Sequence, residues 1–146
     1  MKKIFLIILL SLLVVAFAAK TPATNAAVEI SFFKGTWSEA VAKAKNENRP
    51  IFLDIYATWC GPCKLLKKQT FVDKEVVKFY NANFINVSLD GEKGDGETLA
   101  QKYQITGYPT LIILDNVENP LYATAGFMPP EDFLMFGKEG LKKLKK

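Results

Sequence analysis

The sequence of 146 residues predicts an α/β fold in which a central mixed β-sheet carries helices on both faces. Two observations predict it. First, apolar runs typical of strands alternate along the chain with stretches whose apolar residues recur at helical spacing. Second, the chain closes with two strand-like runs joined by a short turn and then one more helix, which indicates an antiparallel hairpin at one side of the sheet.

A basic start, an apolar run and an exit of small residues open the chain. Lys2 and Lys3 precede residues 4–19, sixteen positions that only Ser11 interrupts. This pattern predicts a secretory signal peptide over residues 1–26, cleaved between positions 18 and 27, followed by one domain over 27–146. A retained membrane anchor stays open as the alternative, although roughly 20 apolar residues are needed to span a bilayer.

The elements of the domain are predicted in order from periodicity and from capping and turn residues. Thr36 and Glu39 have the spacing of a capping box and mark the start of the first helix. The pattern predicts strands over 27–33, 51–57, 84–89, 110–114 and 121–125, and helices over 36–48, 63–70, 74–81, 97–103 and from Pro129 and Pro130 onward. A turn over 58–62 and an acidic loop over 90–96 complete the order.

The chain has two cysteines, Cys60 and Cys63, and no histidine, which excludes several kinds of chemistry. Lys64 follows Cys63, so there is no C-x-x-C-H haem attachment site. A structural zinc site needs four ligands, and a nucleophile–histidine pair needs a histidine. We therefore expect no metal and no cofactor. The pair is then either a structural disulfide or a redox pair.

The formal charge gives no case for nucleic-acid binding. Removal of residues 1–26 takes away three lysines and no acid, so the net charge falls from +4 to +1. A nearly neutral domain lacks the basic surface that a nucleic-acid partner requires.

The spacing of the cysteines at a predicted helix start suits reversible disulfide chemistry. Unpaired N–H groups and the helix dipole stabilise a thiolate on Cys60, and only a thiolate attacks a disulfide. Cys63 lies one turn further along, within reach of Cys60. Pro62 supplies a helical φ angle at a position that needs no N–H donor.

The stretch 52–64, FLDIYATWCGPCK, resembles the active-site strand, turn and helix of the thioredoxin family, and WCGPC is identical to the family motif. Some 45 residues later, Gly107-Tyr108-Pro109-Thr110 resembles the cis-proline loop of that family. The resemblance covers residues 28–144 and implies a thioredoxin fold.

The resemblance also implies roles for individual residues. Cys60 would attack, Cys63 would resolve the mixed disulfide, and Asp54 would be a buried carboxylate that relays a proton to or from Cys63. Pro109 would be cis, and the backbone at Tyr108 would pair with an extended substrate segment. The remaining substrate-binding candidates on the active-site rim are Trp59, Gly61, Pro62 and Gly126. Asn86 stands where cytosolic thioredoxins carry a lysine near the buried aspartate, and this departure weakens the case for a relay.

The function these features predict is reduction of disulfides in exported proteins, in the bacterial periplasm, with a membrane thiol-reductant carrier as electron donor. Glycine and proline between the cysteines are typical of reductants in the family. Two alternatives stay open: an oxidant or isomerase that uses the same residues, and a non-catalytic client-binding module with a structural Cys60–Cys63 bridge.

Overall fold

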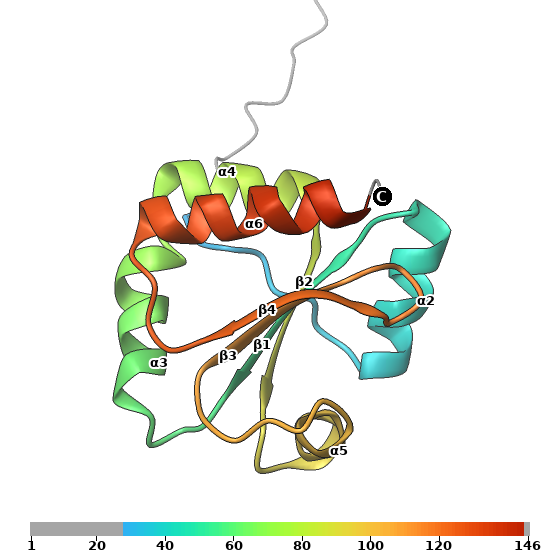
Figure 1. The fold of residues 1–146 in the computed structure, drawn as a ribbon, viewed down its shortest axis with the longest axis horizontal. Helices are drawn as coiled ribbons and strands as arrows, with labels where there is room; N and C mark the ends of the chain where they lie inside the picture. The colour runs from blue at the N-terminus through green and yellow to red at the C-terminus, as the bar shows by residue number, and fades with distance from the viewer. Residues whose placement is uncertain (1–27, 145–146) are drawn as a thin grey trace, which may run out of the picture.

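The computed structural model describes residues 28–144, so the predicted signal peptide lies outside the described residues. Within that range four strands form one sheet: β1 (Ile51–Tyr56), β2 (Ile85–Asp90), β3 (Thr110–Leu114) and β4 (Pro120–Ala125). The strand order is β2-β1-β3-β4, with β2 parallel to β1, and β3 antiparallel to both β1 and β4 (Figure 1). The predicted mixed sheet is confirmed.

Helices cover both faces of the sheet, as predicted (Figure 1). One face packs against α2 (Trp37–Glu47) and α5 (Gly94–Lys102). The other packs against α3 (Gly61–Leu65), its π-helical continuation η1 (Leu66–Thr70), α4 (Lys74–Asn83) and α6 (Pro130–Leu144). No helix within residues 28–144 is both long and apolar enough to cross a membrane.

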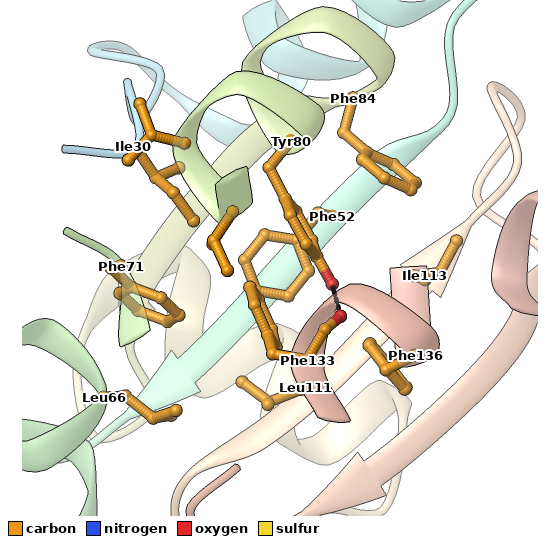
Figure 2. Close-up of a cluster of buried hydrophobic side chains, with 12 residues drawn as sticks. Ile30, Phe52, Leu66, Phe71, Tyr80, Phe84, Leu111, Ile113, Phe133 and Phe136 are labelled. Atoms are coloured by element: carbon orange, nitrogen blue, oxygen red, sulfur yellow. Dashed lines mark hydrogen bonds between the residues drawn. The ribbon is translucent and has the colours of Figure 1, made fainter. Parts of the chain in front are cut away.

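The face under α3, α4 and α6 holds an aromatic core. Phe52 of β1 lies among edge-on rings, and Tyr80 of α4 stacks on Phe133 of α6 with 4.2 Å between ring centroids (Figure 2). The Tyr80 hydroxyl donates a hydrogen bond of 2.7 Å to the Phe133 carbonyl, which satisfies a buried polar group in the core. This contact fixes α6 against α4.

The opposite face is aliphatic. Leu53 and Ile55 of β1 are fully buried against Ala40 and Ala44, whose small side chains let α2 approach the sheet closely. The capping box of α2 is present, because the Thr36 side chain accepts from the Glu39 N–H and the Glu39 carboxylate accepts from the Thr36 N–H. β1 is therefore buried on both faces, as its apolar run predicted.

One predicted strand is absent and several boundaries move by one to three residues. The predicted strand 27–33 is wrong: only Phe32 bridges to Asn86, because the N–H of Ile30 bonds to the Phe71 carbonyl and that of Ser31 to the Asn81 side chain. The acidic loop is shorter, because α5 begins at Gly94. The helix after the cysteines begins at Gly61, before Cys63.

Candidate active site

The cysteine pair lies where β1 leads into α3. Cys60 is the N-cap residue of α3, and its Sγ accepts a hydrogen bond of 3.1 Å from the Cys63 N–H. The two sulfurs are bonded to each other, 2.04 Å apart. Cys60 and Cys63 are 2 % and 3 % exposed, so little of either residue is open to solvent in the disulfide form. A sulfur at a helix N-terminus is in the position that stabilises a thiolate after reduction.

The first turn of α3 is open on its outer side. Gly61 and Pro62 are exposed, and a Cβ added to Gly61 would meet no other atom within 4 Å. The N–H of Phe71 bonds to the Leu66 carbonyl, five residues earlier, which makes η1 a π-helical turn. π-helical turns inside α-helices are frequent at functional sites.

The cis-proline loop lies beside the cysteines. The Tyr108–Pro109 peptide bond is cis, as expected, and Pro109 is buried. Tyr108 packs against the small cluster that contains Cys60 and Cys63. The Pro109 carbonyl accepts a hydrogen bond of 2.9 Å from the Gly126 N–H, and Gly126 has a φ of 95°, a conformation that favours glycine. The structure thus brings Gly126 to the same rim.

Trp59 lies on the surface, not in the core. It is 66 % exposed, and its ring meets that of Tyr108 edge-on at 5.9 Å. Its indole N–H donates to both carboxylate oxygens of Glu92, at 3.1 and 3.2 Å. Glu92 lies in the loop between β2 and α5, so this loop fixes the orientation of Trp59.

Asp54 lies in the middle of β1 and is 1 % exposed. One carboxylate oxygen, Oδ2, accepts a hydrogen bond of 2.7 Å from the Ser88 hydroxyl. The other, Oδ1, has no hydrogen-bond partner among the protein atoms of the described residues. Burial raises the pKa of Asp54 to about 6, against the opposing effects of the Ser88 hydrogen bond and the positive charge of Lys67.

Sequence reasoning missed two residues that act on Asp54, namely Ser88 and Lys67. It singled out Asn86 instead, but Asn86 pairs with Phe52 in the parallel register, whereas Ser88 pairs with Asp54. The Asn86 amide contacts the Tyr80 carbonyl. A parallel alignment of strands 51–57 and 84–89 in the right register would have found Ser88. No sequence pattern predicts that Lys67 lies near Asp54, because its position depends on how η1 packs over the sheet.

A mixed sheet with a disulfide-forming cysteine pair at a helix start and a cis-proline loop beside it defines a thiol–disulfide oxidoreductase of the thioredoxin fold. The family described as thioredoxin-like matches residues 33–116, which is more than half of the chain. The chain belongs to this family.

Relatives with named roles are similar over most of the described domain. The thiol:disulfide interchange protein DsbD of Colwellia psychrerythraea is 33% identical over 118 residues, which cover 75% of this chain and 19% of that protein. DsbD of Yersinia pestis is 32% identical over 94 residues, covering 62% of this chain and 16% of that protein. The chain spans less than a fifth of the length of these relatives.

Solved structures agree on the fold. A protein of Bacteroides thetaiotaomicron described as a candidate disulphide isomerase is 35% identical with a TM-score of 0.71, over 80% of this chain and 96% of that one. The C-terminal domain of Neisseria meningitidis DsbD in its oxidised form has a TM-score of 0.63 at 20% identity, over 75% of this chain and 99% of that domain. The second likeness supports the fold alone.

Proposed function

We propose that the protein reduces disulfide bonds of exported proteins through reversible closure of the Cys60–Cys63 disulfide. The observation that carries this proposal is the bonded pair at the N-terminus of α3, with the Cys60 sulfur accepting a backbone N–H. The neutral Gly61 and Pro62 between the cysteines add no charge to stabilise the thiolate further, which favours a reductant over an oxidant.

The reaction passes two electrons to the substrate. The Cys60 thiolate attacks one sulfur of the substrate disulfide, forms a mixed disulfide and releases the other substrate sulfur as a thiolate. Cys63 then gives its proton to the Asp54 carboxylate through an intervening water and attacks the Cys60 sulfur. The substrate leaves as a dithiol after protonation by solvent, and the enzyme leaves as the disulfide seen in the structure.

Substrate binding would use the rim around the disulfide. We propose that the Tyr108 backbone pairs with an extended substrate segment, next to Pro109, because Tyr108 packs against the cysteine cluster. Exposed Trp59, Gly61 and Pro62 would contact the substrate from the α3 side, and Gly126 from the β4 side.

The cellular setting is part of the same proposal. Residues 1–26 would be a signal peptide that exports domain 27–146 to the periplasm, where a membrane thiol-reductant carrier would restore the two thiols. The similarity to thiol:disulfide interchange proteins supports a partner in thiol–disulfide exchange. Mass spectrometry of the protein recovered from a bacterial periplasm would test export, since it predicts an N-terminus between residues 18 and 27.

One observation favours the alternative function, in which the protein is an isomerase or an oxidant and not a reductant. The Bacteroides thetaiotaomicron structure, similar over 96% of its length, is described as a candidate isomerase. The reduction potential of the Cys60–Cys63 pair, measured against a glutathione or dithiothreitol series, separates the two. We expect about −270 mV, as in thioredoxin, whereas a value at or above about −180 mV would make the protein an isomerase or oxidant.

The non-catalytic alternative has its own test. If the pair were only a structural bridge, Cys60→Ser and Cys63→Ser would leave function intact. We expect both variants to lose disulfide reductase activity, and Cys63→Ser to accumulate the mixed disulfide, which mass spectrometry detects.

A further inference from the structure

Ser88, the hydrogen-bond partner of Asp54, borders a surface pocket. Ser88, whose hydroxyl donates to Asp54, lines a pocket of about 540 Å³. The wall of this pocket also contains Lys67 and Phe71 from the η1 end of the helix, together with residues of the segment 28–34. Asp54 itself is 1 % exposed and does not line the pocket, so Ser88 is the residue that contacts both the carboxylate and the pocket.

Lys67 is held over the same face of β1. Its Nζ lies 3.7 Å from the centroid of the Tyr56 ring, a cation–π contact. Tyr56 follows Asp54 by two residues, and alternate residues of a strand point to the same face. The positive charge is therefore held on the side of the sheet that Asp54 faces.

Among residues 28–144, Lys67 is the cation whose charge acts on Asp54; Lys34 lines the pocket wall but does not shift the pKa of Asp54. β2 contributes the neutral Ser88 at the paired position, and β3 contributes the apolar Leu111. The segment 28–34 contributes Glu29 and Lys34 to the pocket wall, while Cys63 belongs to the disulfide.

We propose that Asp54 exchanges its proton with solvent through the Ser88 hydroxyl and this pocket, and that Lys67 is a positioning residue whose charge returns Asp54 to the carboxylate between turnovers. The inference rests on the proposed role of Asp54 as acceptor of the Cys63 proton. The Asp54 carboxylate first takes the proton of Cys63. The Ser88 O–H, which donates to Asp54 in the structure, then turns to water in the pocket, so that the Ser88 oxygen accepts the Asp54 proton as Ser88 gives its own proton to that water. No other bond changes.

A proton exit through the pocket beside Ser88 would stay open while substrate is bound. The cysteines are almost fully buried, and in the mixed disulfide the substrate would cover the outer side of Cys60. A proton taken up by Asp54 therefore needs an exit that the bound substrate does not block. The pocket beside Ser88 is lined by η1 and segment 28–34, away from the rim formed by Trp59 and Tyr108.

The test compares Lys67→Met with Lys68→Met. Both lysines are exposed and adjacent in η1, but only Lys67 contacts Tyr56 and acts on Asp54. NMR titration of ¹³C-labelled aspartate in the oxidised protein measures Asp54 without cysteine ionisation. We expect the pKa of Asp54 to rise measurably in Lys67→Met, because loss of a nearby cation disfavours the carboxylate. Lys68→Met should titrate like the wild type.

The rate at which Cys63 resolves the mixed disulfide tests the proposed proton exit through Ser88. Ser88→Ala should slow resolution of the mixed disulfide severalfold, and Ser88→Thr, which keeps the hydroxyl, should restore it. The acid limb of the pH–rate profile should move to higher pH in Lys67→Met. Circular dichroism confirms that each variant is folded before it is assayed.

The outcomes separate this inference from the proposed function. If Asp54→Asn reduces disulfides at the wild-type rate and pH profile, the acceptor role fails and the exit route fails with it. If Asp54→Asn is impaired but Lys67→Met titrates like the wild type, the role of Lys67 is overturned alone. If Ser88→Thr is as slow as Ser88→Ala, the hydroxyl route is overturned alone.

Discussion

The carboxyl group of Asp54 is buried in the folded protein, and its burial disfavours the charged form. Its pKa of about 6 lies above its ordinary value of 3.8, so between these two values the folded protein holds a proton that the unfolded chain has released. Stability from this group is complete below about pH 4 and is lost as the pH rises through about 6. The lost contribution amounts to about 3 kcal/mol at neutral pH.

We therefore expect Asp54→Asn to remove this part of the pH dependence of stability. Urea unfolding of the oxidised protein and of the variant should show a free-energy difference that moves in favour of the variant by about 2 kcal/mol between pH 4 and pH 7. A difference that stays constant with pH would show that folding does not raise the pKa of Asp54.

Trp59 donates its indole N–H to Glu92, and this hydrogen bond restrains the side chain on the rim. In a Trp37→Phe background, Glu92→Ala removes the acceptor of the indole N–H, so the fluorescence anisotropy of Trp59 should fall. The free energy of unfolding should change by less than about 1 kcal/mol, because the contact is exposed. Glu97→Ala is the control: it removes an acid from the first turn of α5 that is not the indole's acceptor. Equal anisotropy in all three proteins would contradict the role of Glu92.

Among the elements, α6 approaches the sheet through a glycine. A Cβ at Gly140 would lie 2.2 Å from Ile113 Cδ1 and 3.0 Å from its Cγ2, in a fully buried part of β3. Gly140→Ala should therefore destabilise the protein by about 1–3 kcal/mol, although alanine is the better helix former. Urea unfolding measures this loss, and Lys138→Ala, at an exposed position of the same helix, should stay within about 0.5 kcal/mol of the wild type. Stabilisation by Gly140→Ala would mean that α6 can move away from β3 at little cost.

Short sequence patterns correctly predicted the helices and strands that depend on interactions between residues close together in the chain. The capping box at Thr36 and Glu39 placed the start of α2, and the apolar run after Pro50 placed β1. The alternation of Val28, Ile30 and Phe32 predicted a strand over 27–33, but only Ile30 is buried; Phe32 is partly buried and Val28 is 83 % exposed. Burial and strand pairing leave the same period in a sequence. The backbone of this segment makes one bridge to β2, at Asn86, and the N–H groups of Ile30 and Ser31 bond to the Phe71 carbonyl and the Asn81 side chain.

The residues of the active site also fall into two groups, those that a local sequence motif predicts and those that only the tertiary structure places. The motif placed Cys60 and Cys63 at a helix start, and the loop at Pro109 beside them. Ser88 depends on strand register, and Lys67 on the packing of η1, so neither could be read from a local pattern. The residues that surround the reactive pair and set its protonation come from the tertiary structure.

At the scale of the whole molecule, the N-terminal segment 28–33 completes a domain that the family match does not fully include. The match begins at residue 33, yet Ile30 is 2 % exposed within the aromatic core. The Phe32 ring lies edge-on to Phe71 with 5.4 Å between centroids. This segment also lines the pocket next to Ser88, so it connects the core to the proposed proton exit.

Two truncations test how far the domain extends. A protein of residues 27–146 should unfold in one cooperative step, with circular dichroism and tryptophan fluorescence giving the same urea midpoint. A protein of residues 34–146 loses the buried Ile30 side chain and the backbone bonds that this segment makes to Phe71 and Asn86. It should be less stable by at least about 3 kcal/mol, since burial of one isoleucine and each hydrogen bond stabilise by amounts of this order. Equal stability of the two proteins would place the start of the folding unit at helix α2. It would show that residues 27–33 contribute nothing to the free energy of unfolding.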